Sequence, residues 1–509
     1  MFTVKDELRT APFALGLSLL NLLLFHWPFF SFVFHDFEEL NVNSGLVMIS
    51  LLMLMVAVNF LFFYLLLTLS RRFGKILLIL VFILNAAAVY FVNAYSIIID
   101  GIMMSNLFHT DVEESGSFIS VKLFVYILLL GVVPSLFIAR AKLVKSSAKI
   151  FFLITVITFS FIAIIVFANA RNWLWIDKNS VKLGALAMPW SYSVNSSIMM
   201  MREYEKNKKE ILLPNATIKD NQKSIVVLVI GESSRSKNFS LYGYQNNTNP
   251  LLSQTKNLYH FNATSFSTYT TAGIKAILEH THTDELYEIL PNYLYRNKVD
   301  VIWRSTNWGE PPIHIKNYQD KNALMENCKG DSCEYDEILL KGLTEQIKSG
   351  NSNKVFVVLH TSTSHGPIYS KKYPPSFETF KPVCNSVDLG KCSQQELINA
   401  YDNTIVYTDY LLHRVIEELK QLPEYNSCMF FVSDHGESLG ENNLYMHGLP
   451  RSMAPKEQYE IPFLVWLSDS SHVQLKSIPE VTQNNVFHSV LHFLGMQSPV
   501  YDEKMDIFK

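Results

Sequence analysis

The sequence lacks any concentration of positive charge. Its 43 Lys and Arg residues are nearly balanced by 46 Asp and Glu residues, which gives a formal net charge of −3, and no basic stripe or arm is present. Proteins that bind nucleic acid present such a stripe to the phosphate backbone. Nucleic acid is therefore excluded as an expected partner.

Cysteine is scarce and confined to the later part of the chain. Only five cysteines occur among 509 residues. Two close pairs, Cys328 with Cys333 and Cys384 with Cys392, indicate local disulfides in an oxidising compartment. Neither pair has the two-residue spacing of a zinc knuckle, which disfavours the alternative of four zinc ligands. Cys428 lies in an apolar run and is expected to be a buried free thiol.

Charge is almost absent from five long apolar runs in the first third of the chain. A helix needs roughly 20 apolar residues to cross the hydrocarbon core of a bilayer. The runs therefore predict five transmembrane helices, at roughly residues 12–34, 46–69, 76–99, 121–139 and 150–169. The first run is too long for a cleaved signal peptide, and four more follow it.

Lys and Arg are also missing from two loops between these runs. Residues 35–45 and 100–120 contain neither, whereas residues 70–75 and 139–149 contain three and four. Loops rich in Lys and Arg stay in the cytoplasm. The N-terminus is therefore expected in the cytoplasm, and five crossings leave everything after about residue 170 on the outer side.

The rest of the chain divides into a connector and a second domain. The connector mixes aromatic clusters, NWLWI and MPWSY, with a charged stretch. We expect short helices at the membrane surface there, and a plain helical linker is the alternative. The predicted domains are a transmembrane domain at 1–170, an interfacial linker at 171–222 and a periplasmic domain at 223–509.

Short runs rich in β-branched and aromatic residues begin after residue 223. They are IVVLVI, VDVIWR, KVFVVLH, CMFFVS and PFLVWL, and helical-length segments such as residues 395–422 lie between them. Continuous apolar runs are typical of strands buried on both faces. The predicted fold is an α/β domain with a mainly parallel sheet sandwiched by helices.

Polar clusters follow three of these predicted strands directly. IVVLVI leads into GESSR with Glu232, KVFVVLH into TSTSHGP with His365, and CMFFVS into Asp434 and His435. Ligand sites in open α/β sheets lie beyond the carboxyl ends of the strands, so these three ends are expected to converge. Glu232, Asp434 and His435 offer oxygen and nitrogen ligands that suit Zn²⁺ or Mn²⁺. An isolated Asp-His pair would more often belong to a turn.

A divalent metal beside a hydroxyl can generate a nucleophile, because it lowers the pKa of a coordinated oxygen. The candidate hydroxyls are those of Ser233, Ser234, Thr268, Thr270 and Thr271. The threonines lie in STYTTAGIKAILEH, where a polar turn changes to a helical pattern, and backbone N–H groups at a helix start favour a phosphate. Capping of that helix is the alternative role for these hydroxyls.

Four segments resemble the successive motifs of the membrane-bound phosphoethanolamine transferases, within the alkaline phosphatase and sulfatase superfamily. They are VVLVIGESSRSKNFSLYGYQNNTNP, LHTSTSHGPIYSKKYPPSFETFKPVC, LINAYDNTIVYTD and FVSDHGESLGENNLYMHGLPRSMAPKEQ. The resemblance covers nearly the whole chain and implies five helices followed by a periplasmic catalytic domain. It also implies Zn²⁺ as the cofactor, held by Glu232, the nucleophilic threonine, Asp434 and His435. His365 and His447 match the histidines that contact the substrate phosphate.

The threonine segment departs from the best-known pattern of that family. Many lipid A-modifying members have the threonine between two disulfide-bonded cysteines, in a Cys-Gly-Thr-Ala-Thr context. This chain has Thr-Tyr-Thr-Thr-Ala at residues 268–272 and no cysteine nearby. Register with the following helix favours Thr270 as the nucleophile, with Thr271 as the alternative.

Four other polar residues near the motifs are expected to have structural roles. His280 and His282 lie beyond the matched motifs, and we do not expect them to bind a second metal ion. Arg235 and Asn238 closely follow Glu232 and are expected to hold their loop rather than to contact the substrate.

The resemblance implies transfer of phosphoethanolamine from phosphatidylethanolamine to lipid A or the lipopolysaccharide core, through a covalent phosphoethanolamine–threonine intermediate, in the bacterial inner membrane. Such a change lowers the anionic charge of the acceptor and would weaken binding of cationic peptides such as polymyxin. The alternatives are a glycerol-phosphate transferase similar to lipoteichoic acid synthase, a catalytically inactive lipid-binding module, and a hydrolase. The paired cysteines argue against the first and the intact metal-site residues against the second.

Overall fold

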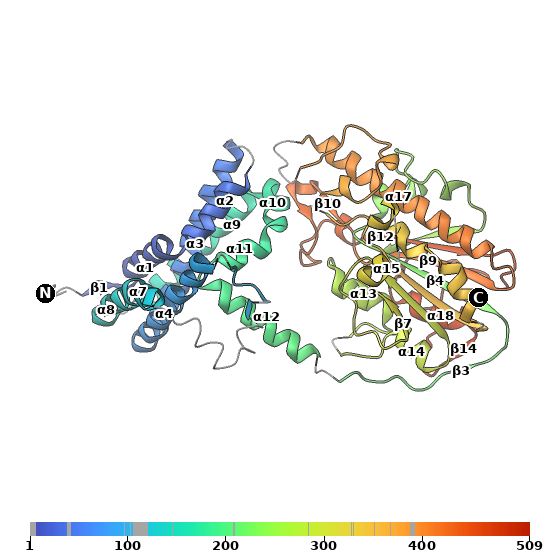
Figure 1. Cartoon of the computed structure of the whole chain (residues 1–509), viewed down its shortest axis with the longest axis horizontal. Helices are drawn as coiled ribbons and strands as arrows, with labels where there is room; N and C mark the ends of the chain where they lie inside the picture. The colour runs from blue at the N-terminus through green and yellow to red at the C-terminus, as the bar shows by residue number, and fades with distance from the viewer. Residues whose placement is uncertain are drawn as a thin grey trace. The chain divides into compact units, whose positions relative to one another are not determined.

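The computed structural model divides into two compact units, Met1–Lys208 and Lys209–Lys509. The first unit is helical, and the second is built around a β-sheet (Figure 1). The structure describes residues 7–37, 42–95, 97–101, 103–104, 121–144, 146–206, 209–283, 285–326, 328, 330–350, 352–366, 368–386 and 392–509.

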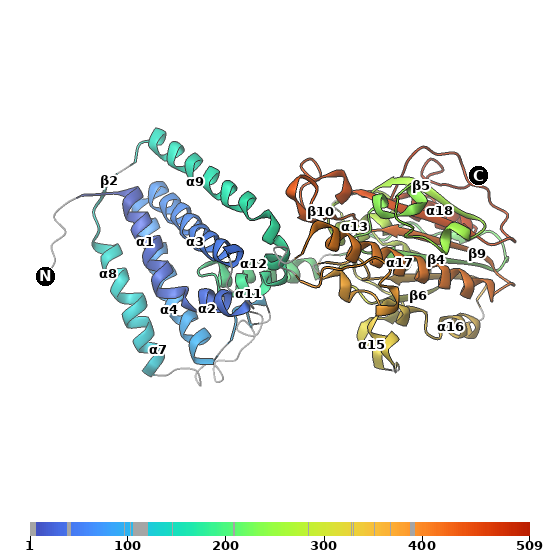
Figure 2. The ribbon, with the colours of Figure 1, turned by 90° about the horizontal axis from the view of Figure 1, so that it is seen from above.

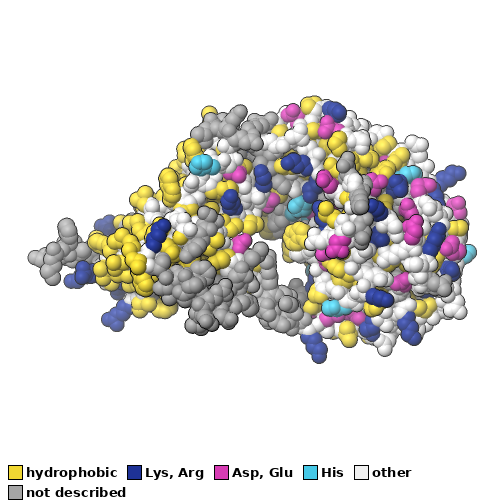
Figure 3. Space-filling view, in the orientation of Figure 1, with side chains coloured by type: hydrophobic (Ala, Val, Ile, Leu, Met, Phe, Trp, Pro, Cys, Tyr) yellow, Lys and Arg dark blue, Asp and Glu magenta, His cyan; other side chains and the backbone are white. Residues whose placement is uncertain are grey.

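Long apolar helices make up the first unit. The uninterrupted ones are α3 (Val42–Leu69), α4 (Arg71–Tyr95) and α9 (Ala148–Ala168). Another apolar segment runs continuously through α7 (Val121–Tyr126), a π-helical stretch (Ile127–Val132) and α8 (Val133–Arg140). All four are long and apolar enough to cross a membrane. Hydrophobic side chains accordingly gather on the outside of this unit (Figure 3).

The first predicted span is a bent pair of helices. α1 (Thr10–Phe25) and α2 (Trp27–Asp36) meet at an angle of 63° and satisfy the criteria for a span only when they are taken together. Pro28, at the start of α2, has no N–H to donate to the preceding turn, which accounts for the break. The described part of the chain therefore contains four candidate spans, or five if the bent pair is one, in agreement with the sequence.

Three shorter helices end the first unit: α10 (Trp173–Lys178), α11 (Ser180–Leu186) and α12 (Trp190–Lys206). Two polar side chains of α12 bond to asparagines on the long helices. Trp190 Nε1 donates to Asn59 Oδ1 at 3.0 Å, and Tyr192 OH donates to Asn85 Oδ1 at 2.9 Å. These bonds satisfy buried polar groups among apolar helices. The location of residues 171–222 at the membrane surface stays a prediction.

An eight-stranded sheet lies at the centre of the second unit (Figure 2). Its strands are β4 (Ser224–Gly231), β5 (Leu258–Thr264), β6 (Asp300–Ser305), β7 (Asn317–Gln319), β8 (Lys354–His360), β9 (Asn426–Ser433), β12 (Glu460–Leu467) and β13 (Val481–Thr482). They lie in the order β13-β5-β12-β9-β4-β8-β6-β7. β12 runs antiparallel to β5 and β9, and the other described pairs are parallel. All five predicted strands lie in this sheet, which confirms the predicted fold class.

Three two-stranded pairs lie outside this sheet. They are β1 (Leu8–Arg9) with β2 (Leu143–Val144), β3 (Thr217–Ile218) with β14 (Met496–Gln497), and β10 (Ser438–Leu439) with β11 (Tyr445–Met446).

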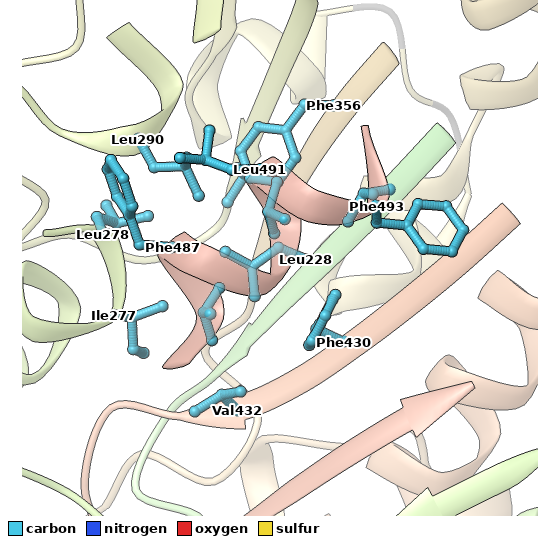
Figure 4. Close-up of a cluster of buried hydrophobic side chains, with 14 of the residues drawn as sticks. Leu228, Ile277, Leu278, Leu290, Phe356, Phe430, Val432, Phe487, Leu491 and Phe493 are labelled. Atoms are coloured by element: carbon cyan, nitrogen blue, oxygen red, sulfur yellow. The ribbon is translucent and has the colours of Figure 1, made fainter. Parts of the chain in front are cut away.

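Helices cover both faces of the central sheet. They are α13 (Thr270–Leu278), α14 (Leu290–Arg296), α15 (Lys321–Glu326), α16 (Leu343–Gly350), α17 (Gln394–Lys420) and α18 (Asn485–Phe493). Side chains of α13, α14 and α18 pack on the face that carries Leu228 and Phe430 (Figure 4). On the opposite face, Val227 lies beside Ile347 of α16 and Val415 of α17. Alternate residues of each strand therefore bury on opposite sides, as the continuous apolar runs predict.

Phe430 on β9 tests how much this core contributes to stability. Its ring is fully buried and lies 6.2 Å from the ring of Phe463 and 6.0 Å from that of Phe508. Phe430→Ala removes these contacts and leaves a cavity. We therefore expect the free energy of unfolding to fall by about 3–5 kcal/mol. Thermal unfolding of the purified full-length protein measures the change.

Tyr259→Ala is the control for this substitution. Tyr259 lies on β5 of the same sheet but is 44% exposed, and its removal should cost about 1 kcal/mol or less. Equal unfolding midpoints for the two variants would contradict the assignment of Phe430 to the core.

Candidate metal centre and nucleophile

The register of β4 and β9 positions two carboxylates. Gly231 and Ser433 are paired at the ends of these parallel strands, and the next residues are Glu232 and Asp434. Asp434 N donates to Gly231 O at 3.0 Å, and Ser233 N donates to Asp434 Oδ1 at 3.0 Å. The two turns are thus joined beyond the last strand pair, and their acidic side chains are held together.

Glu232, Asp434 and His435 form a buried cluster. Each offers one ligand atom, and these atoms all lie within 4.8 Å of one another. Nε2 of His435 is 3.3 Å from Glu232 Oε1 and 3.4 Å from Asp434 Oδ2. Asp434 Oδ2 is buried and has no hydrogen-bond partner among the described residues. Burying a carboxylate oxygen without a partner costs free energy, and a cation bound at this oxygen would offset that cost. Two carboxylates and an imidazole fit a divalent metal ion.

The charges of this cluster are strongly coupled. Burial alone would raise the pKa of Glu232, but the hydrogen bond and charge of His435 hold that pKa well below its usual value. Burial and the charge of Glu232 raise the pKa of Asp434 well above its usual value. Burial would lower the pKa of His435, but Glu232 raises it. One imidazole cannot neutralise both carboxylates, and a divalent cation would supply the missing positive charge.

Thr270 is the first residue of α13 and lies beside this cluster. Its Oγ1 is 3.2 Å from Nε2 of His435, and its side chain is buried, whereas that of Thr271 is exposed. The helix approaches β9 closely because Gly273 has no side chain. A Cβ there would lie 2.7 Å from the carbonyl carbon of Asp434. The structure therefore brings Thr270, and not Thr271, to the three candidate ligands.

The other candidate hydroxyls are engaged elsewhere. Ser233 Oγ donates to Glu232 Oε1 at 2.8 Å, and Ser234 Oγ donates to the carbonyl of Glu232 at 3.3 Å. Thr268 Oγ1 donates to the carbonyl of Leu449. These hydroxyls therefore bond within loops, and no described side chain caps the start of α13, so the alternative role of helix capping is not observed for them.

Both predicted histidines lie near the cluster. The ring of His447 is 4.1 Å from that of His435, and the ring of His365 is 6.1 Å from that of His447. Nδ1 of His447 donates to Glu437 Oε2 at 3.1 Å, and Nδ1 of His365 donates to the carbonyl of Gly366 at 2.6 Å. Donation from Nδ1 leaves Nε2 of each imidazole available to a ligand.

Two residues at the site were not identified from the sequence. Asn307 Nδ2 donates to Glu232 Oε2 at 2.6 Å and to the carbonyl of Thr361 at 3.1 Å. Glu437 is fully buried and orients His447. Asn307 follows the predicted strand VDVIWR by three residues, and Glu437 lies within the DHGE motif. A search of every strand end would have found both.

Four residues were expected to have structural roles: Arg235, Asn238, His280 and His282. Arg235 Nε donates to Asn238 Oδ1 at 2.6 Å, and Arg235 Nη1 pairs with Glu441 Oε1 at 2.7 Å, so this group holds its loop. The ring of His280 contacts Tyr287. His282 stacks on Phe266, outside the metal cluster.

The predicted disulfides are present in the second unit. Cys328 is bonded to Cys333 with an S–S length of 2.11 Å, and Cys384 is bonded to Cys392 with an S–S length of 2.08 Å. Cys428 is a buried free thiol, as predicted.

The second unit carries its polar groups at the carboxyl edge of the sheet, and the family model described as sulfatase matches residues 224–496. The unit therefore belongs with the sulfatase-like enzymes of the alkaline phosphatase superfamily. A second model, described as phosphoethanolamine transferase EptA/EptB, matches residues 40–204 of the helical unit. A relative that is 40% identical over 97% of this chain shows that the chain belongs to the phosphoethanolamine transferases.

Phosphoethanolamine transferase EptA of Helicobacter pylori is 40% identical, over 97% of this chain and 95% of the relative. Phosphatidylethanolamine transferase Mcr-1 of Escherichia coli is 30% identical, over 77% of this chain and 78% of the relative. The structure is also similar to the integral membrane protein lipooligosaccharide phosphoethanolamine transferase A of Neisseria meningitidis. That likeness has a TM-score of 0.60 at 25% identity and covers 99% of each chain. The chain is therefore a membrane-bound enzyme with a C-terminal soluble domain.

Gly273→Ala tests whether the position of α13 controls activity. The added Cβ would collide with the backbone of Asp434 and push Thr270 away from the cluster. A displacement of about 1 Å can reduce a reaction rate about 100-fold, so we expect a loss of that order in transferase activity.

Gly184→Ala in α11 is the matched control, since nothing lies within 4 Å of a Cβ there. It should keep wild-type activity per mole of folded protein. Wild-type activity of Gly273→Ala would show instead that α13 can move without displacing the threonine.

Proposed function

We propose that the protein transfers phosphoethanolamine from phosphatidylethanolamine to lipid A or the lipopolysaccharide core. The donor is supported by the name of Mcr-1, and the acceptor class by the lipooligosaccharide transferase of Neisseria meningitidis. The observation that carries the proposal is the contact between Thr270 Oγ1 and His435 Nε2 at the edge of the buried Glu-Asp-His cluster.

Zn²⁺ is the proposed cofactor, and Glu232, Asp434, His435 and the hydroxyl of Thr270 are its proposed ligands. The unpartnered oxygen of Asp434 and the mixed oxygen and nitrogen donors support this choice. When bound, the ion would lower the pKa of the threonine hydroxyl and stabilise negative charge on the phosphoryl oxygens.

Thr270 is the proposed nucleophile. Its Oγ1 attacks the phosphorus of the donor, a new P–O bond forms, and the bond from phosphorus to the diacylglycerol oxygen breaks. His365 and His447 bind the phosphoryl oxygens or protonate the leaving oxygen. No described side chain caps the start of α13, and the backbone N–H groups of its first turn favour the anionic phosphoryl group. A hydroxyl or phosphate oxygen of the acceptor then attacks the phosphoethanolamine–threonine intermediate and releases the threonine.

The proposed location is the inner membrane, with the N-terminus in the cytoplasm and the second unit in the periplasm. The distribution of Lys and Arg among the short loops supports this orientation. Two disulfides in the second unit suit an oxidising compartment. Donor and acceptor are then both amphiphiles within reach of the same anchored enzyme.

The first test is release of diacylglycerol from tail-labelled phosphatidylethanolamine by the detergent-solubilised protein. Thr270→Ala should reduce release about 1000-fold or more, because the attacking oxygen is lost. Thr271→Ala is the matched control, since this adjacent threonine is exposed, and it should stay near wild type. A chelator should abolish release and zinc should restore it.

Other results would redirect the proposal. Release that survives Thr270→Ala would move the nucleophile to another oxygen. Free phosphoethanolamine formed without an acceptor would indicate a hydrolase, and preferential use of phosphatidylglycerol would indicate a glycerol-phosphate transferase.

Zinc affinity should weaken as the pH falls. Burial and the charge of Glu232 raise the pKa of Asp434, so protons compete with the ion for this carboxylate more strongly than at an ordinary aspartate. Each proton released on binding corresponds to about a tenfold loss of affinity for each unit of lower pH. Competition with a chelator between about pH 6 and pH 8 measures this slope. An affinity independent of pH would contradict zinc binding through the Asp434 carboxylate.

A further inference from the structure

Two large aromatic side chains are exposed next to the proposed nucleophile. Tyr269 directly precedes Thr270 and is 50% exposed. Trp308 is 63% exposed and precedes Gly309, where a Cβ would lie 3.3 Å from Cγ2 of Thr270. The segments that carry the two rings therefore meet at the threonine.

This exposure is unusual for tryptophan in the second unit. Its other tryptophans, Trp303 and Trp466, are 0% and 3% exposed. Phe266, which is 44% exposed, lies on the same loop as Tyr269, and its N–H donates to Gln483 Oε1 at 2.9 Å. We call Phe266, Tyr269 and Trp308 the aromatic rim.

The aromatic rim has no charge of its own. The segments SFSTYTTAG (265–273) and STNWG (305–309) contain no Asp, Glu, Lys or Arg. Glu310, which follows the second segment, is a charged residue, and its carboxylate accepts a hydrogen bond from Tyr318 OH at 2.7 Å. Neither the hydroxyl of Tyr269 nor the indole N–H of Trp308 bonds to a described residue. The rim is thus apolar, with two donors that bond to no described residue, beside the proposed phosphoryl-transfer site.

We propose that the aromatic rim binds the glycerol ester region and the first acyl carbons of the glycerophospholipid donor. This inference rests on the proposed function. When the phosphorus of such a lipid lies at Thr270 Oγ1, only one oxygen separates it from the glycerol. The two ester groups must then lie close to the threonine, at which the segments that carry the exposed rings meet.

The chemistry of the rim matches this part of a lipid. Tyrosine and tryptophan favour the level of a bilayer at which polar ester groups meet hydrocarbon, because each combines an apolar ring with one donor. The indole N–H and the phenol can donate to ester carbonyls while the rings cover methylene groups. The rim would then act on binding of the lipid and not on the chemistry at phosphorus.

Kinetics with two donors test the proposal in the full-length protein. For phosphatidylethanolamine in mixed micelles, Trp308→Ala and Tyr269→Ala should each raise KM about tenfold with little change in kcat. With glycerophosphoethanolamine, which has the same headgroup and no acyl chains, both variants should match wild type. Tyr295→Ala is the control, since this tyrosine is 40% exposed on α14, and it should match wild type with both donors.

Lipid contact can also be measured without turnover. Phosphatidylethanolamine brominated on its acyl chains quenches nearby tryptophan fluorescence, and this quenching should be smaller in Trp308→Phe than in wild type. Wild-type protein that releases no diacylglycerol would overturn the proposed function, whereas the quenching experiment would still report on the rim.

Three results would overturn the inference. Equal losses of kcat/KM with phosphatidylethanolamine and with glycerophosphoethanolamine would show that the rim only positions Thr270. Unchanged kinetics and unchanged quenching would show that the rings do not touch the lipid. A raised KM confined to the lipopolysaccharide acceptor would assign the rim to the second substrate.

Discussion

Two parallel strands, β4 and β9, end at the same level of the sheet, and the candidate site depends on that register. Gly231 and Ser433 form their last pair, so the residues that follow, Glu232 and Asp434, leave the sheet side by side. A shift of one residue in either strand would turn its carboxylate to the opposite face. The buried apolar side chains of both strands fix the register, and the core thereby controls the chemistry at its edge.

That arrangement has an electrostatic cost. Glu232 and Asp434 are buried together with one imidazole. His435 holds the pKa of Glu232 low, whereas burial and the charge of Glu232 raise the pKa of Asp434. The surrounding donors reduce the cost only partly. Asn307 and Ser233 each donate to Glu232, whereas Asp434 Oδ2 has no donor among the described residues. One imidazole and these donors leave the Asp434 carboxyl group incompletely compensated, and a divalent cation would supply the missing interaction.

The sequence predicted the features that depend on local pattern. Continuous apolar runs predicted the strands, and the polar residues directly after them predicted the cluster. The antiparallel direction of β12 was not predictable, because an apolar run carries no information about direction. Asn307 also follows a predicted strand, but a single amide there suggests no chemistry until its hydrogen bond to Glu232 is seen. Register with the following helix already favoured Thr270 over Thr271, and the structure places the hydroxyl of Thr270 beside His435.

The threonine segment also shows how α13 can be positioned without the cysteines that flank it in many relatives. Gly448 N donates to the carbonyl of Thr268 at 2.8 Å, and Thr268 Oγ1 donates to Leu449 O, so the loop before the helix is held to the segment that carries His447. Gly273 then allows the helix backbone to contact Asp434. These contacts join the proposed nucleophile to Asp434, a candidate ligand, and to the segment that carries His447. A disulfide within the helix segment would restrain the segment alone, whereas these bonds also fix its distance from the Glu-Asp-His cluster.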